Sequence, residues 1–260
     1  MIDPKAEISA KTIKKLYNGE IDLVFNKNGH RYTIKDRQCV GVTTVLSTLA
    51  KPALIPWAVN MTIEYLQSTL KPGEKYDEVQ LMAMFKEAKG AHRKKKEAAA
   101  DLGSLVHKWL EQYIKGENPE MPQNEQMKLS ITAFLKWTKD NKVRFIESER
   151  VVYSKKYNFA GTCDFTCEIN GKKYIGDIKT SNAIYNEYLL QVSAYRYAIQ
   201  EESNDLYDGM LIVRVPKTAE EIEVFEFNDF QENAKAFIYL LNVYNRLQIL
   251  KNISLKGVKP

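Results

Sequence analysis

Apolar positions along this chain change repeatedly between helical and strand spacing, which predicts a mixed α/β fold. Helical spacing predicts helices over residues 53–70, 76–114 (interrupted near Gly90), 124–140, 186–200 and 229–249. Segments rich in β-branched and aromatic residues predict strands at 144–154, on both sides of Asn170-Gly171, at 209–215 and at 221–227, and a hairpin over 21–34. From residue 124 onward the predicted order is therefore helix, three strands, helix, two strands, helix.

Nothing in the chain marks a clean domain boundary, because it has no internal repeat, low-complexity tract or Gly/Ser linker. We expect a mainly helical N-terminal lobe with a short hairpin over residues 1–99, packed on an α/β core over residues 100–260. Thr180 and Ser181 are expected to cap the helix that begins near residue 186.

A two-residue turn at Asn170-Gly171 predicts the register of the central hairpin. Asn-Gly favours a type I′ turn, so residues 169 and 172 would close the ladder and Asp164 would lie directly opposite Asp177. Opposed side chains have Cβ atoms roughly 4.5–5.5 Å apart, and strand alternation puts Lys179 on the same face as Asp177. Two carboxylates and an amine are therefore expected to converge.

Two carboxylates this close are unfavourable unless their charge is compensated. At about 5 Å and an effective dielectric of about 20 they repel by roughly 3 kcal/mol. A divalent cation removes that repulsion, and Mg²⁺ takes one or two carboxylates while leaving other positions to water and phosphate. One interpretation is thus a metal site for phosphodiester hydrolysis. The other is a set of ordinary charges on an exposed hairpin face, with Lys179 offsetting one carboxylate.

Composition narrows the class of protein. The 260 residues are 44% hydrophobic, which is ample for a buried core, and the net charge of +5 permits a polyanionic partner without requiring one. No apolar run approaches the length of a membrane span and the N-terminal segment lacks a signal-peptide pattern, so we expect no membrane association. The chain also lacks a P-loop and a G-x-G-x-x-G motif, which disfavours a nucleotide-driven motor and a Rossmann cofactor.

Cysteines are few and odd in number, namely Cys39, Cys163 and Cys167. An odd count without a secretory leader predicts free thiols in a reducing compartment. Three cysteines cannot supply the four thiolates of a typical iron–sulfur cluster, so we expect no such cluster.

Two further groups of polar residues lie on predicted helices. His107 is either a core histidine or a third metal ligand or substrate contact, since neutral imidazole can add nitrogen to a carboxylate site. Gln191 and Tyr195 are four residues apart and share a helix face. They either form a polar helix edge packed on the sheet, or they bind phosphate or orient Lys179.

The densest basic segment of the chain spans residues 89–96. Such runs are usually solvated helix faces, but near a hydrolytic metal site they would supply sequence-independent, salt-dependent phosphate contacts. Its candidate DNA-binding residues are Lys89, Arg93, Lys94 and Lys96.

Four short motifs occur in order along the chain. They are Gly103–His107 as G-x-x-x-H, Gly161–Asp164 as G-x-x-D, Asp177-Ile178-Lys179, and Gln191–Tyr195 as Q-x-x-x-Y. Together they resemble the RecB-like branch of the PD-(D/E)xK nuclease superfamily, over about residues 100–200. VTTVL from Val42 and KPALIPWA from Lys51 also resemble the N-terminal part of phage exonucleases and of the mitochondrial genome-maintenance exonuclease in this branch.

This resemblance implies a restriction-endonuclease-like fold, in which helices flank a mixed central sheet. It implies that Asp164 and Asp177 bind the metal and that Ile178 contributes its backbone carbonyl. It also implies that Lys179 positions or activates the attacking water. The metal would be one or two Mg²⁺ ions, with Mn²⁺ as a substitute.

The remaining motifs carry further implications of the same resemblance. His107 corresponds to a metal-associated histidine, and Gln191 and Tyr195 to residues that contact DNA and organise the active site. The helical lobe with its basic segment corresponds to the part that guides a single strand in relatives. Some relatives carry a four-cysteine iron–sulfur staple, which this chain lacks.

The function implied is a metal-dependent DNA exonuclease acting on single strands or free ends, in recombination, replication or DNA degradation. We expect it in the cytoplasm, or in the host cytoplasm if the chain is phage-encoded. One alternative is a structure-selective endonuclease of the same fold. Another is a nucleic-acid-binding protein without catalysis, whose expected mark would be loss of an acid or of the lysine, and all three are present.

Overall fold

The computed structural model describes residues 11–29, 31–216 and 221–253. The chain divides into two compact units, one made of Met1–Thr48 with Lys108–Pro260 and the other of Leu49–His107. Throughout the described ranges, no helix is long and apolar enough to cross a membrane.

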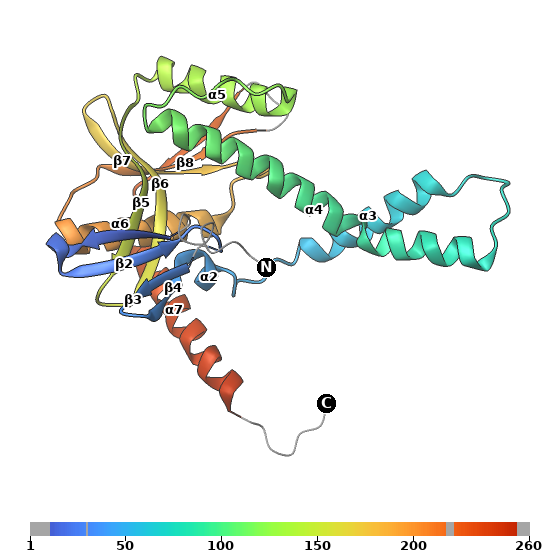
Figure 1. Cartoon of the computed structure of the whole chain (residues 1–260), viewed down its shortest axis with the longest axis horizontal. Coiled ribbons are helices and arrows are strands. Elements are labelled where there is room, and N and C mark those ends of the chain that lie inside the picture. The colour runs from blue at the N-terminus through green and yellow to red at the C-terminus, as the bar shows by residue number, and fades with distance from the viewer. Residues whose placement is uncertain (1–10, 30, 217–220, 254–260) are drawn as a thin grey trace. The chain divides into compact units, whose positions relative to one another are not determined.

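The described residues form both helices and strands, and from residue 124 onward their order is the predicted one (Figure 1). The strands are β1 (Lys11–Leu16), β2 (Ile21–Asn26), β3 (Arg31–Ile34), β4 (Arg37–Gly41), β5 (Arg144–Ser154), β6 (Phe159–Ile169), β7 (Lys172–Lys179), β8 (Gly209–Arg214) and β9 (Glu223–Phe227). The helices are η1 (Tyr17–Gly19), α2 (Val42–Leu46), α3 (Leu54–Thr69), α4 (Glu78–Ile114), α5 (Glu125–Asp140), α6 (Asn186–Ser203) and α7 (Phe230–Asn252).

A single mixed sheet of nine strands forms the centre of the first unit. Its order is β1-β2-β3-β4-β6-β7-β8-β9, and β5 pairs with β6 beside this path. Two of the pairings, β4 with β6 and β7 with β8, are parallel, and the others are antiparallel. The predicted α/β class with a mixed sheet is confirmed.

The first strands of the chain belong to this sheet. β4 pairs with β6 through Val40–Phe159 and Gly41–Ala160, which joins the N-terminal hairpins to the core. The structural division therefore differs from the sequence-based boundary between residues 99 and 100. Only Leu49–His107, which contains α3 and most of α4, forms a separate helical unit.

Two local predictions about helices are corrected by the structure. The predicted interruption near Gly90 is absent, because α4 is described as one helix that passes through it. The predicted cap by Thr180 and Ser181 is wrong as well. The N-cap of α6 is Tyr185, which makes no side-chain capping bond, and the Ser181 hydroxyl donates instead to the Ala183 carbonyl at 2.8 Å.

Aromatic packing fixes the strands that carry the candidate site. Phe134 of α5 stacks on Phe145 of β5, and Phe145 meets Phe165 of β6 edge to face. A Cβ at Gly176 would lie 2.0 Å from Phe165 Cζ, so β7 can pair there only with glycine at this position. The residue after this glycine is Asp177. Helix α6 packs across β5, β6, β7 and β8, and α7 packs on α6 (Figure 1).

Candidate active site

The predicted register of the β6–β7 hairpin is confirmed. Both residues of the Asn170-Gly171 turn have positive φ, at 52° and 78°, as a type I′ turn requires. The ladder pairs Phe165 with Gly176. Asp164 and Asp177 are the next residues outward, so the register brings the two acids opposite each other.

Asp164 is tied to β7 through the backbone. Its Oδ2 accepts a hydrogen bond from the Ile178 amide at 2.7 Å. Burial raises the pKa of this carboxyl, while the Lys179 ammonium and the Ile178 amide oppose that shift without cancelling it. The structure thus holds a desolvated carboxyl beside the Asp-Ile-Lys segment, where added positive charge would stabilise its ionised form.

Four side chains from β7 and α6 form one connected polar network. Lys179 Nζ lies 2.5 Å from Asp177 Oδ2 and donates to Gln191 Oε1 at 3.1 Å. The Gln191 amide donates to Asp177 Oδ1 at 3.1 Å and to the Tyr195 hydroxyl at 2.9 Å. Gln191 therefore contacts Lys179 directly, and its role in orienting that ammonium stays a prediction.

The charges of this network favour an ammonium at Lys179. Burial lowers its pKa, but the carboxylates of Asp177 and Asp164 outweigh burial, so the pKa lies above its ordinary value. Burial raises the pKa of the Tyr195 phenol well above its usual range, and the charge on Asp177 raises it further. At neutral pH the site therefore presents a positive lysine and a neutral phenol.

The G-x-x-D motif has a steric explanation. A Cβ at Gly161 would lie 2.4 Å from Tyr195 Cε1 and 3.3 Å from Val42 Cγ2. Only glycine leaves room for the Tyr195 ring, which is 3% exposed. The glycine of one motif therefore allows the tyrosine of another to reach the site.

Glu149 is a site residue that the sequence analysis missed. The β5–β6 ladder pairs Ser148 with Phe165 and Arg150 with Cys163, which brings Glu149 opposite Asp164. Burial, followed by the charges on Asp164 and Glu111, raises the pKa of Glu149 to about 8. Three acids, Glu149, Asp164 and Asp177, thus occupy matching positions on β5, β6 and β7.

Two features hid Glu149 in the sequence. It has a φ of 53°, which non-glycine residues rarely adopt, and the β5–β6 register shifts between Phe145 and Glu147. No turn motif in the sequence predicts such a register shift. The one available signal was the position of a glutamate in a segment of β-branched and aromatic residues.

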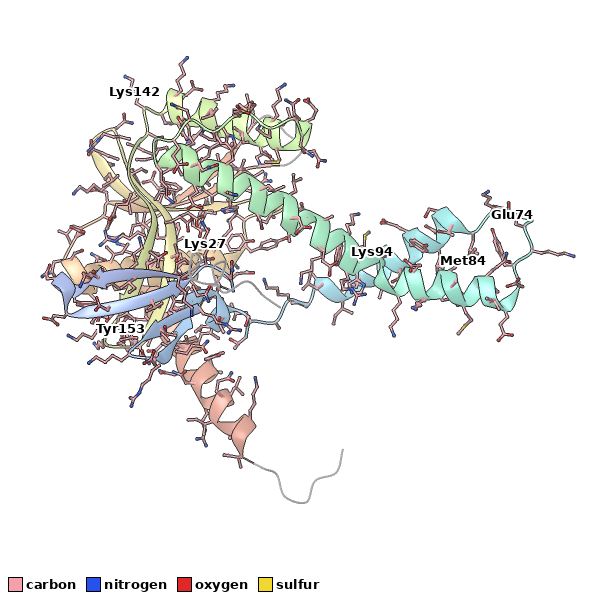
Figure 2. The ribbon with its side chains drawn as sticks, viewed as in Figure 1. Lys27, Glu74, Met84, Lys94, Lys142 and Tyr153 are labelled. Carbon is pink, nitrogen blue, oxygen red and sulfur yellow. The ribbon has the colours of Figure 1, made fainter. Side chains whose placement is uncertain are left out.

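Another acid near Asp164 and Glu149 is Glu111, which forms ion pairs with two lysines. Glu111 pairs with Lys27 at 3.0 Å and with Lys115 at 2.5 Å (Lys27 is labelled in Figure 2). Burial raises the pKa of Glu111, but the two lysines outweigh it and the net shift is downward. Glu111 therefore adds a fixed negative charge to the surroundings of Asp164 and Glu149.

The oxygen donors present fit a hard divalent cation. Asp164 and Asp177 offer two carboxylates, which is the number that Mg²⁺ commonly takes in proteins, and Glu149 lies opposite Asp164. Within residues 11–29, 31–216 and 221–253, no cluster of three or more His, Cys, Asp or Glu side chains is arranged to hold a metal on its own. Two carboxylates with water and phosphate remain the appropriate donor set.

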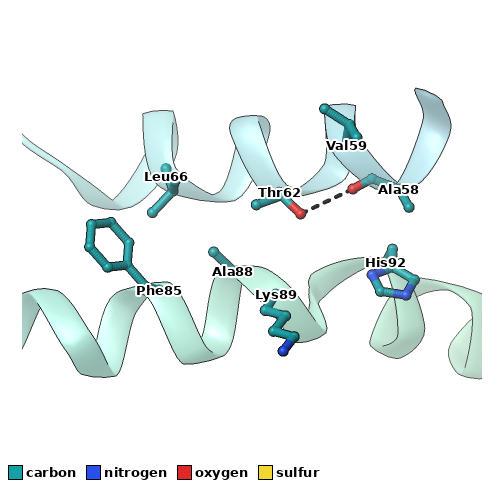
Figure 3. Close-up of a pocket in the computed structure, with 8 residues that line it drawn as sticks. All are labelled: Ala58, Val59, Thr62, Leu66, Phe85, Ala88, Lys89 and His92. Atoms are coloured by element: carbon teal, nitrogen blue, oxygen red, sulfur yellow. Dashed lines mark hydrogen bonds between the residues drawn. The ribbon is translucent and has the colours of Figure 1, made fainter. Parts of the chain in front are cut away.

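The remaining predicted site residues belong to the other unit. His107 is half-buried and is the last residue of Leu49–His107, and its role as a metal ligand stays a prediction. The four basic candidates are exposed on α4, where Lys94 pairs with Glu87 (Lys94 is labelled in Figure 2). Lys89 also lines a cavity of about 300 Å³ between α3 and α4, beside His92 and opposite Thr62 (Figure 3).

Comparison with known proteins gives matches in structure only. No family model and no curated protein sequence matches the chain. The solved structure of the protein SSO0001 is 18% identical, covering 75% of this chain and 87% of the other, with a TM-score of 0.37. A candidate exonuclease from Eubacterium rectale is 14% identical over 58% of this chain and 66% of the other, with a TM-score of 0.41. An alkaline exonuclease from Laribacter hongkongensis is 14% identical, covering 62% of this chain and 87% of the other, with a TM-score of 0.30. None of these TM-scores reaches 0.5, so we infer function from the site itself.

Proposed function

We propose that this protein is a metal-dependent deoxyribonuclease that hydrolyses phosphodiester bonds, acting as an exonuclease on single strands or free ends. The observation that supports this most is the connected arrangement of Asp177, Lys179 and Gln191, with Asp164 opposite Asp177. A half-buried lysine held by both a carboxylate and an amide, next to a second acid, has no evident purpose in packing. It suits a reaction in which negative charge develops on a phosphate.

In this proposal, Asp164 and Asp177 would hold Mg²⁺, with the Ile178 carbonyl as a further ligand, and Mn²⁺ could substitute for Mg²⁺. When bound, the ion supplies Lewis acidity and lowers the pKa of a coordinated water. The remaining chemistry falls to the chain. Because Lys179 is an ammonium, it stabilises the developing negative charge and orients the attacking water, and it does not remove a proton. Gln191 keeps the ammonium in place.

DNA is the proposed substrate, and the helical unit Leu49–His107 is proposed as a second region that contacts it. Lys89, Arg93, Lys94 and Lys96 would bind backbone phosphates without reading sequence. His107 would be a metal ligand. Gln191 and Tyr195 would contact the DNA and organise the active site. The proposed biological process is recombination, replication or DNA degradation.

End-labelled linear and covalently closed circular single-stranded DNA, incubated with the protein in Mg²⁺, test the proposal. Wild type should shorten the linear strand, leave the circle intact and stop in EDTA, and Mn²⁺ should restore activity. Asp177→Asn should lower cleavage by at least about 1000-fold while DNA binding changes little. Asp22→Asn, at an exposed position on β2 where Asp22 pairs with Lys15, is the matched control and should cleave normally. Cleavage by Asp177→Asn at the wild-type rate would refute the assignment.

The same assay separates the alternatives. Cutting of the circle indicates a structure-selective endonuclease with the same site. Binding without cleavage of either substrate, in Mg²⁺ or Mn²⁺, indicates a nucleic-acid-binding protein that retains the fold without catalysis.

A further inference from the structure

Two tyrosines lie beside the lysine of the candidate active site. The Lys179 ammonium stands 4.7 Å from the centroid of the Tyr188 ring, within the range of a cation–π interaction. The Tyr185 ring meets the Tyr188 ring edge to face, with centroids 5.6 Å apart and planes at 79°. An aromatic pair therefore runs from the catalytic ammonium outward to the start of α6.

The two rings have different surroundings. Tyr188 is half-buried and carries Lys179 over its ring. Tyr185 is 44% exposed and makes no side-chain capping bond for the helix that it begins. Packing beside Lys179 accounts for the first ring and leaves the exposed position of the second unexplained.

Substrate chemistry accounts for an aromatic ring at this place. An ammonium that stabilises a scissile phosphate fixes where that phosphate lies, and a nucleobase is attached through a sugar to each neighbouring phosphate. Aromatic side chains stack on nucleobases without regard to sequence, since every base offers a π-face. A tyrosine one ring away from the ammonium is within the region that such a base occupies.

We propose that Tyr185 is a nucleobase-binding residue that stacks on the base next to the scissile phosphate, with Tyr188 as the support that holds it beside Lys179. The inference rests on the proposed nuclease function and adds a substrate requirement to it. A base can stack on a tyrosine only after leaving its own stack, so the site selects single strands or frayed ends over intact duplex.

A cycle between protein and substrate tests the contact directly. The probe is a fluorescein-labelled oligodeoxythymidylate, measured by fluorescence anisotropy in EDTA so that binding is read without cleavage. A second set of probes carries one abasic residue, moved stepwise from each end. Tyr185→Leu should weaken binding of the intact probe about 5- to 150-fold, which is the range for loss of one stacked base. Tyr185→Phe, which keeps the ring, should bind as wild type does.

The abasic probes make the assignment specific. At one position, the abasic residue should weaken wild-type binding by the same factor as Tyr185→Leu weakens binding of the intact probe. On that abasic probe, Tyr185→Leu and wild type should bind equally well. Tyr239→Leu is the matched control, because Tyr239 is an exposed tyrosine on α7, and it should leave binding unchanged. Equal losses for Tyr185→Leu on intact and abasic probes at every position overturn the proposal, as does wild-type binding by this variant.

Cleavage measured in parallel distinguishes this proposal from the function on which it rests. If Tyr185→Leu binds the probe as wild type does, and both the variant and wild type digest DNA, the stacking contact is refuted and the proposed nuclease function is retained. If wild type neither binds nor cleaves the probes, both are refuted. In the expected outcome the variant raises KM while kcat falls less than threefold, because the ring contacts a base and not the reacting atoms.

Discussion

Replacing Glu149 by glutamine should change how the stability of the metal-free protein depends on pH. Glu149 lies opposite Asp164 across the β5–β6 ladder, in a conformation with a φ of 53°. Burial and the charges on Asp164 and Glu111 raise its pKa to about 8, against an ordinary value of 4.5. Glutamine keeps the shape of the side chain and cannot ionise.

The sign of the effect follows from proton linkage. Glu149 holds its proton more tightly in the folded protein than in the unfolded chain, so protonation favours folding. Its contribution to the free energy of unfolding is fully present below pH 4.5 and is lost as the pH rises through about 8. The wild type should therefore lose stability over this window relative to Glu149→Gln.

The structure also sets the size of the loss. Each unit between the folded and unfolded pKa is worth about 1.36 kcal/mol, which gives a ceiling of about 5 kcal/mol for this residue. Glu149 also lines an open polar cavity of about 410 Å³, where water weakens the interactions between charges. We therefore expect the stability difference between the two proteins to change by about 2–4 kcal/mol from about pH 5 to about pH 9.

Urea denaturation in EDTA at a series of pH values measures this difference, and unchanged m values show that both proteins unfold in the same way. Glu232→Gln is the control, since it removes the same functional group from an exposed position on α7. Its effect should vary by less than about 0.5 kcal/mol across the series. Parallel pH profiles for wild type and Glu149→Gln would show that Glu149 is not a buried neighbour of Asp164.

Four further outcomes are expected. Lys179→Met should lower kcat at least about 100-fold and lower the free energy of unfolding by about 2–4 kcal/mol in urea titrations, because it leaves a buried carboxylate without its cation. Gly161→Ala should cost about 1–3 kcal/mol by overpacking, and calorimetry should show that the same substitution costs less in a Tyr195→Ala background, where the ring is absent. Mg²⁺ at about 100 times its Kd should raise the free energy of unfolding by about 2.7 kcal/mol, and EDTA should reverse this. Combining Lys89→Ala with Arg93→Ala should reduce the slope of log Kobs against log salt for a single strand by about 1.4.

The features predicted most accurately from the sequence are those that depend on local chemistry. Asn170-Gly171 specifies a type I′ turn by itself, and the turn specifies the register that brings Asp164 opposite Asp177. The order of elements from α5 to α7 is also correct, because the β-branched and aromatic content of its strands is a local signal. Local prediction failed where a polar side chain had several possible hydrogen-bond partners nearby. Ser181, for example, donates to the Ala183 carbonyl instead of capping α6.

Features that depend on distant pairing could not be predicted. KTIKKL, which forms β1, has little apolar character and becomes a strand by pairing with β2. The parallel contact between β4 and β6 joins residues that are far apart in the chain, and no motif records it. Glu149 is hidden for a related reason, because its place in the site depends on a register shift and on an uncommon backbone conformation.

Three of the four motifs, which are separate in the sequence, contact one another in the structure. Gly161 leaves the space that the Tyr195 ring fills, Gln191 donates to the Tyr195 hydroxyl, and the same amide group contacts both Asp177 and Lys179. A side chain at residue 161 must therefore disturb the lysine, although the two do not touch. Gly161→Ala should thus reduce kcat more than it affects DNA binding. A variant that is destabilised but fully active would show that the tyrosine yields without moving the glutamine, and that the network is less tightly coupled than its hydrogen bonds indicate.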